Sequence, residues 1–235
     1  MKILAIECSA APVSAAVISE GNTIVSSAFS NVKLTHSQTL FPLIKNVLDS
    51  ARITFKDIDA IGVAVGPGSF TGLRIGISSA KGLAEPRDLK CAGVSSLEAA
   101  AYMFSGGDAV ICPVIDARCG QVYNALFDVS ENSVTRLCED RALMIENLLG
   151  DLETISRNGD RKIILCCDAA NAVMTAANGI KGVKTAPVPL LYQNAAGVGL
   201  CAAKKIEEGN YVRSSGLMPV YLKLPQAERE LKAKL

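Results

Sequence analysis

The sequence is poor in the residues on which many catalytic and metal sites depend. Among its 235 residues there is no tryptophan and a single histidine, His36. Histidine-based metal sites need several converging ligands, often four residues apart on a helix, and the residue four positions after His36 is Leu40. A Ser–His–Asp or Cys–His arrangement would have to use this one imidazole. We therefore expect no metal site and no catalytic centre of these types.

An excess of charge of either sign is also absent. The chain has 24 basic and 23 acidic residues, a net charge of +1, and no cluster of lysine and arginine interrupts this balance. Proteins that bind nucleic acid mainly through its phosphates usually carry a basic stripe. The composition therefore argues against strong, direct binding of RNA or DNA.

No apolar run reaches the ~18 residues that a membrane-spanning helix needs. The apolar N-terminus is interrupted by Glu7 and followed by a turn at Pro12, so we expect a buried strand there and not a secretion signal. Eight cysteines are scattered along the chain without a Cys-x-x-Cys pair, which is typical of reduced thiols in a cytoplasmic protein.

Hydrophobic periodicity predicts alternating strands and helices. In the first half, strands are expected at 3–6, 13–18 and 23–29, a helix near 35–51, a strand at 58–65, a helix at 70–83, a strand at 91–94 and a helix at 96–104. In the second half, strands are expected at 110–115, 121–127 and 133–138, a helix at 142–155, a strand at 162–166, a helix at 169–178, a strand at 183–187 and a helix at 194–207.

Both halves therefore share a β-β-β-α-β-α order, and each first strand ends in an acid, Glu7 or Asp116. This repeat predicts an α/β fold of two actin-like, ribonuclease-H-like lobes, the second reduced. The Gly-rich segment 105–108 gives the boundary. We expect an N-terminal lobe at 1–107, a smaller lobe at 108–212, and a tail at 213–235 that ends in a surface helix.

The segment Gly66-Pro67-Gly68-Ser69 joins a predicted strand to a predicted helix. A helix N-terminus can hold a phosphate, but no Gly-Lys-Ser/Thr ending makes this a P-loop. The alternative is a tight turn with Ser69 as the N-cap.

The helix that follows carries small residues four apart, Gly72, Gly76 and Ala80. Glycine inside a helix costs about 1 kcal/mol relative to alanine, so a compensating close contact is expected. Either the helix packs tightly on this protein's own sheet, or it docks on a second subunit with Phe70 and Arg74 as anchors.

Nucleotide binding is a further hypothesis. In actin-like ATPases an acid after the first strand orients magnesium-bound water, and a serine in the next turn contacts phosphate. Glu7, Ser9 and Asp116 occupy such places here. The second half lacks a Gly-rich nucleotide-binding loop, which argues against ATP hydrolysis.

Several segments together resemble the bacterial TsaB family, also called YeaZ. They are Lys2–Glu7, His36–Gln38, Gly66–Gly76, Gly93–Glu98 and Ile115–Arg118. The resemblance implies an actin-like fold and a role in making threonylcarbamoyladenosine in tRNA, together with a TsaD-like transferase and a TsaE-like ATPase. The transferase family has a His-x-x-x-His metal motif where this chain has Ser96 and Ala100.

The resemblance also implies that homodimer and transferase contacts use the same N-terminal helices. We therefore expect a non-catalytic subunit that binds and stabilises the transferase, forms a homodimer when alone, and meets tRNA only through the complex. A nucleotide at a subunit junction is left open. The rival hypotheses are an actin-like ATPase or kinase and a metallopeptidase-like enzyme. The expected interface residues are His36, Leu40, Leu43, Ile44, Phe70, Thr71, Gly72, Arg74, Ile75, Gly76 and Ala80.

Overall fold

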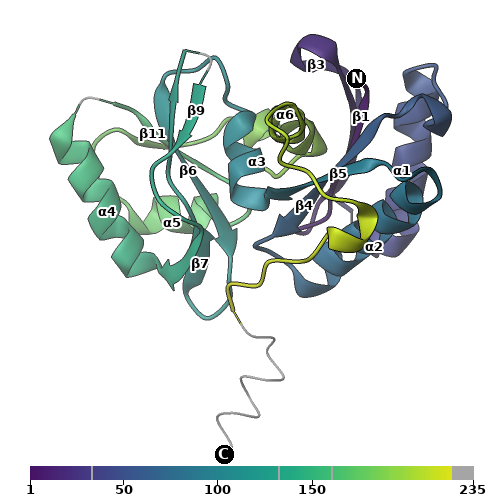
Figure 1. The fold of residues 1–235 in the computed structure, drawn as a ribbon. Helices are drawn as coiled ribbons and strands as arrows, with labels where there is room; N and C mark the ends of the chain where they lie inside the picture. Colours follow the sequence, from purple (N-terminus) through teal and green to yellow (C-terminus); the bar gives the residue numbers. More distant parts are fainter. Residues whose placement is uncertain (33, 132, 160, 224–235) are drawn as a thin grey trace, which may run out of the picture.

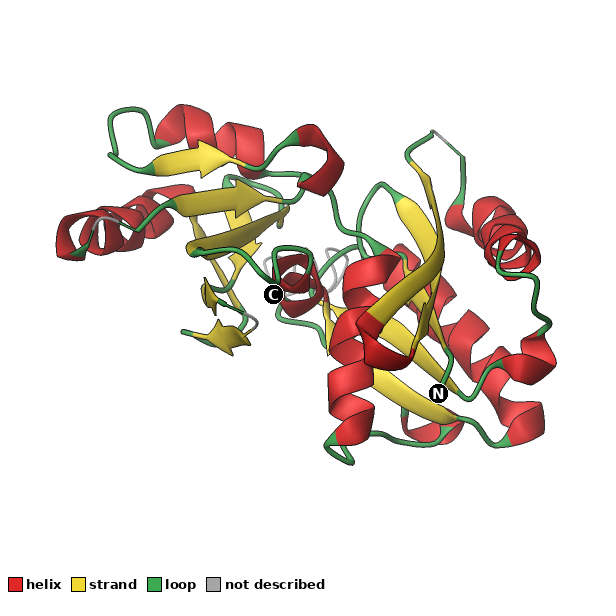
Figure 2. Ribbon diagram, turned by 90° about the horizontal axis from the view of Figure 1, so that it is seen from above, coloured by secondary structure: helices red, strands yellow, loops and turns green. Residues whose placement is uncertain are grey.

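Two β-sheets lie side by side in the computed structural model of the chain, and helices cover their faces (Figures 1 and 2). The structure describes residues 1–32, 34–131, 133–159 and 161–223. The predicted α/β fold with two lobes is confirmed.

The first sheet has the strand order β3-β2-β1-β4-β5. Strands β1–β3 form an antiparallel meander, and β4 and β5 continue the sheet in parallel with β1. The elements are β1 (Ile3–Glu7), β2 (Val13–Ser19), β3 (Thr23–Ser30), α1 (His36–Ser50), β4 (Ala60–Gly66), α2 (Phe70–Ala84), β5 (Lys90–Ser95) and α3 (Ser96–Tyr102).

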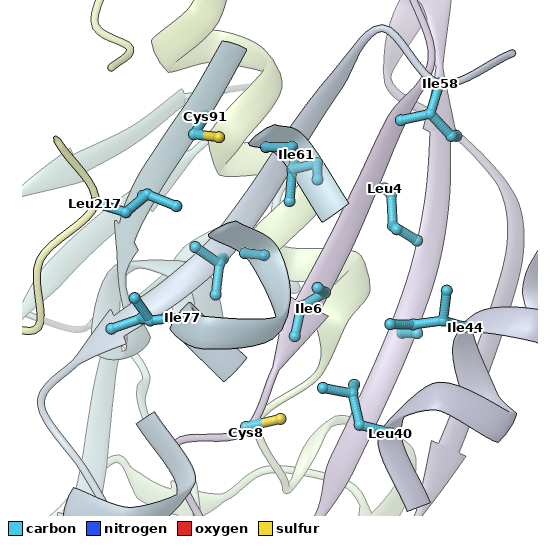
Figure 3. Packing of buried hydrophobic residues seen from close by; sticks show 14 of the residues in the cluster. Leu4, Ile6, Cys8, Leu40, Ile44, Ile58, Ile61, Ile77, Cys91 and Leu217 are labelled. Carbon is cyan, nitrogen blue, oxygen red and sulfur yellow. The ribbon is translucent and has the colours of Figure 1, made fainter. Parts of the chain in front are cut away.

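Helices α1 and α2 cover one face of this sheet. The apolar stripe of α1 points at β1, so that Leu40 and Ile44 pack in one cluster with Leu4 and Ile6 (Figure 3). This stripe follows the spacing of a helix with one buried face. Pro42 lies within α1, and the helix continues to Ser50.

The second sheet has the order β10-β7-β6-β11-β12, with β8 and β9 attached beside β6. Its elements are β6 (Ala109–Asp116), β7 (Gln121–Asn124), β8 (Phe127–Ser130), β9 (Ser133–Arg136), β10 (Arg141–Met144), α4 (Ile145–Asn158), β11 (Ile163–Cys166), α5 (Ala170–Ala176) and β12 (Val183–Thr185).

Two predictions for this lobe were wrong in detail. The single strand expected at 121–127 is two strands, which pair with different ends of β6. The break lies opposite Pro113, which has no N–H to donate, and the Asn124 side chain donates to the Pro113 and Ala125 carbonyls, at 3.0 Å each. Residues 142–144, expected in a helix, pair with β7 as part of β10.

The last helix, α6 (Ala195–Glu207), returns to the first sheet. It packs on the face opposite α1 and α2, and the Ala195 amide donates to Ser14 Oγ on β2 at 2.9 Å. Its small residues allow close approach, because a Cβ at Gly199 would lie 2.2 Å from Ile18 Cγ1. The last helix of the 108–212 segment, which was expected in the second lobe, therefore packs on the first lobe.

After α6 the chain stays on the first lobe. Val212 bridges to Cys91 at the edge of β5, a short 3-10 helix follows at Ser214–Gly216, and the Val220 amide donates to the Val65 carbonyl at 2.8 Å. The tail expected at 213–235 is thus packed against the protein as far as 223. The helix expected at 226–235 lies outside the described residues. Among the described residues, no helix combines the length and the hydropathy of a membrane span.

Candidate functional site

A cleft of about 550 Å³ lies between the lobes. Turns that follow β1, β4 and β6 form its walls, together with residues 220–223. Because these strands end at the same edge of their sheets, the loops after them meet, as is usual for ligand sites of parallel α/β sheets.

The turn before α2 belongs to the cleft wall. Ser69 is the N-cap of α2: its Oγ accepts a hydrogen bond from the Gly72 amide at 3.3 Å, and its own amide donates to the Ser9 carbonyl at 2.6 Å. The interpretation of this segment as a tight capped turn is confirmed. A phosphate at this helix start stays a prediction.

The small-residue stripe of α2 is buried inside the chain. A Cβ at Gly72 would lie 2.1 Å from the Cys8 carbonyl oxygen, and one at Gly76 would lie 3.3 Å from Cys8 Cβ. Ala80 is also fully buried. The stripe lets α2 lie directly against the end of β1, so the expectation that these three residues meet a second subunit was wrong.

Glu7 lies below the cleft and not on its wall. Its carboxyl is fully buried, and Oε1 accepts a hydrogen bond from the Ser9 amide at 2.5 Å. Burial raises the pKa of Glu7 to about 7, although hydrogen bonds from Ser9 and the Cys8 amide oppose this rise. The Ser9 hydroxyl lies near this carboxyl, and among the described residues Ser9 Oγ and Glu7 Oε2 are buried without a hydrogen-bond partner.

The other two residues proposed to bind a nucleotide, Ser9 and Asp116, line the cleft. Asp116 is joined there by Asp168, whose Oδ1 accepts a hydrogen bond from the Asp116 amide at 3.1 Å. Burial raises the pKa of Asp168 above its ordinary value. Sequence reasoning missed Asp168, although its position directly after a strand parallel to β6 could have indicated it.

His36 also faces the cleft. It lies at the start of α1, and its Nε2 donates to the Ala10 carbonyl at 2.9 Å. The imidazole therefore connects α1 to the turn between β1 and β2. The expected role of His36 at a subunit interface stays a prediction.

Among the described residues, no group of three or more His, Cys, Asp and Glu side chains is arranged to hold a metal ion. Ser96 and Ala100 are both buried in α3.

A second surface lies on the outer side of α1 and α2. Two shallow grooves of about 370 and 390 Å³ adjoin at Ser78. We call this surface the α1–α2 face; its residues are Phe41, Phe70, Thr71, Arg74, Ile75, Ser78, Ser79, Gly82 and Leu83.

Phe41 is 51% exposed on this face. Of the interface residues expected from the sequence, four lie here: Phe70, Thr71, Arg74 and Ile75. Leu40 and Ile44 instead lie on the inner side of α1 and are buried, and Leu43 is half-buried against the same core.

Similar folds are found among solved structures. The chain superimposes on YeaZ from Pseudomonas aeruginosa with a TM-score of 0.79 and 23% identity, covering 94% of this chain and 99% of that one. It superimposes on (R)-2-hydroxyglutaryl-CoA dehydratase component A from Acidaminococcus fermentans with a TM-score of 0.50 and 13% identity, covering 88% and 99%. The chain therefore shares the fold of these proteins, which agrees with the actin-like α/β fold predicted from the sequence.

Sequence similarity narrows this class. Residues 26–203 match the family model described as TsaD, tRNA N6-adenosine threonylcarbamoyltransferase. The chain is 31% identical over 228 residues to the tRNA threonylcarbamoyladenosine biosynthesis protein TsaB of Bacillus subtilis (strain 168), covering 97% of this chain and 96% of that protein. The chain belongs to the TsaB family of tRNA threonylcarbamoyladenosine biosynthesis proteins.

Proposed function

We propose that this chain is a non-catalytic subunit of the threonylcarbamoyladenosine synthesis machinery and binds a TsaD-like transferase through the α1–α2 face. One observation carries the proposal: the outer side of two neighbouring helices exposes an aromatic ring, Phe41, beside two adjoining grooves. Exposed apolar surface of this kind is typical of protein interfaces.

The TsaD family model covers three quarters of the chain, so the proposed partner has a related fold. Two related folds can pair about an approximate two-fold axis, with the same helices meeting from each side. The same geometry supports a homodimer when the transferase is absent. The two pairings would then compete for one surface.

The cleft supports the non-catalytic part of the proposal. Glu7 corresponds to the acid that orients magnesium-bound water in actin-like ATPases, but here it is buried away from the cleft. Because burial raises its pKa to about 7, much of this carboxyl is protonated and uncharged near neutral pH. His36 is engaged by the Ala10 carbonyl. We propose further that the pair with the transferase recruits a TsaE-like ATPase, that tRNA is reached only through the complex, and that the protein works in the cytoplasm.

The test is the affinity of the full-length chain for the TsaD transferase of the same organism, measured by isothermal titration calorimetry. Phe41→Glu and Ser78→Arg place a charge on the α1–α2 face, and each should weaken binding at least about tenfold, because a buried unpaired charge is costly. Val188→Glu is the matched control, since Val188 is 78% exposed on the second lobe.

All three side chains are exposed, so thermal unfolding should change little. Unchanged affinity of both face variants would refute the interface. Sustained ATP hydrolysis by the isolated chain, lost in Asp116→Asn, would refute the non-catalytic role.

A further inference from the structure

The last described residues, 217–223, form a segment that we call the strap. Its first residue, Leu217, is 1% exposed and packs in the first-lobe core with Ile77 and Cys91 (Figure 3). Three residues later the Val220 amide donates to the Val65 carbonyl at 2.8 Å, at the end of β4. The strap is therefore fixed to the first lobe before it reaches the cleft.

Tyr221 strengthens this attachment. Its ring stacks on Phe70 with 4.7 Å between ring centroids, and its hydroxyl accepts a hydrogen bond from Arg74 Nε at 3.1 Å. The Arg74 guanidinium in turn lies 3.9 Å from the centre of the Phe70 ring. Stacked aromatic and cation–π contacts of this type stabilise a chosen side-chain position beyond simple burial.

Two residues further on, the strap contacts the other lobe. Lys223 Nζ donates to the Ala117 carbonyl at 2.7 Å and to Gln121 Oε1 at 2.5 Å. Ala117 belongs to the loop between β6 and β7 on the opposite wall of the cleft, and Gln121 is the first residue of β7. In Figure 1 the yellow segment runs from beside α2 to this loop below β6 and β7. Since two residues span at most ~7 Å, Tyr221 and Lys223 cannot move independently over large distances.

We infer that the strap is a clasp that holds the two lobes at a fixed separation across the cleft. Besides the chain connections, the lobes meet at α3, whose Leu97 packs in one core cluster with Ile111 and Phe127 of the second lobe. Rotation of the lobes as rigid bodies about this contact would open or close the cleft. The clasp opposes this rotation because Tyr221, which is held on the first lobe, positions Lys223, which is hydrogen-bonded to the second lobe. The inference is independent of the proposed function, since it concerns the isolated chain and needs no partner.

The test is hydrogen exchange of the 117–121 loop, followed by mass spectrometry on the full-length chain. The loop amides are protected by hydrogen bonds between Ala117 and Gln121 and between Gln121 and Arg118. Lys223→Met removes both charged hydrogen bonds to the second lobe. It should raise exchange in this loop at least about tenfold, since one charged hydrogen bond alone is worth that much. Lys56→Met, at an exposed lysine of the 3-10 helix Phe55–Asp57, is the control and should change nothing.

Tyr221→Ala gives the sharper result. The ring and hydrogen-bond contacts of Tyr221 are with the first lobe, so a purely local role would affect exchange only near Phe70 and Arg74. The clasp predicts faster exchange in the 117–121 loop as well, with little further change in the double variant Tyr221→Ala/Lys223→Met. Normal exchange of the loop in either single variant would overturn the inference, as would simple addition of the two effects.

Discussion

The buried carboxyl of Glu7 gives the most direct quantitative prediction. Replacing it with glutamine keeps the size of the side chain and removes its negative charge. We expect Glu7→Gln to be more stable than the original chain at about pH 8 and similar to it at about pH 5. The reason is that burial disfavours the charged carboxylate, whereas the neutral amide has no charge to desolvate.

The size of this effect follows from the pKa. Burial raises the pKa of Glu7 from 4.5 to about 7, and each pKa unit is worth about 1.4 kcal/mol. Between these two values the folded chain holds the Glu7 proton and the unfolded chain has lost it. The folded state therefore binds more protons, and its stability falls as the pH rises. The loss should be complete above about pH 7 and amount to about 3 kcal/mol.

Urea unfolding at a series of pH values measures this difference, because the free energy of unfolding extrapolates linearly from the denaturant dependence. Other titrating groups are present in both chains, so they cancel when the two curves are subtracted. Glu146→Gln, at an exposed position of α4, is the control and should give a flat difference. Parallel pH dependence of Glu7→Gln and the original chain would show that Glu7 does not stay protonated in the folded protein.

Two further predictions concern glycine packing and thiol reactivity. Gly72→Ala should lower the free energy of unfolding by about 1–3 kcal/mol or more, because its Cβ would lie 2.1 Å from a backbone oxygen. On the same helix, a Cβ at Gly82 meets nothing within 4 Å. Gly82→Ala should therefore raise the free energy of unfolding by about 0.5–1 kcal/mol in the same urea assay. Among the eight cysteines only Cys119 is exposed. A colorimetric thiol reagent at about pH 8 should therefore modify the Cys119 thiol quickly and that of half-buried Cys138 more slowly. Burial raises the pKa of Cys91 to about 11, which keeps the fraction of its reactive thiolate small. A fast reaction that persists in Cys119→Ser would contradict this assignment.

The elements of the first lobe could be predicted because each carries an unambiguous local pattern. The stripe of α1 has helical spacing over three turns, and the Ser69 turn has a residue suited to cap α2. In the second lobe the pattern is weaker: residues 142–144 carry no marker that separates a short strand from the start of α4. Pro113 breaks the pairing along β6, but nothing local shows that Asn124 fills the gap.

The site could be predicted only in part because it depends on which surfaces meet. The spacing of Gly72 and Gly76 correctly indicated a close contact, yet spacing alone does not tell a neighbouring strand from a second subunit. Burial decided between them, because Cys8 lies directly beneath. Lys223 and Gln121 are 102 residues apart in sequence, and no local pattern relates them.

The return of α6 to the first sheet has a consequence for folding during synthesis. One face of that sheet, including Ile3, Ala5 and Ile18, is covered by a helix that ends at Glu207. At roughly 5–20 residues per second, translation of the ~100 residues between the first lobe's last strand and that helix takes about 5–20 s. Throughout this interval α3 covers only part of that apolar face, through Ala99. A fragment that stops at 107 should therefore aggregate, and the newly made chain should be a substrate for ribosome-associated chaperones.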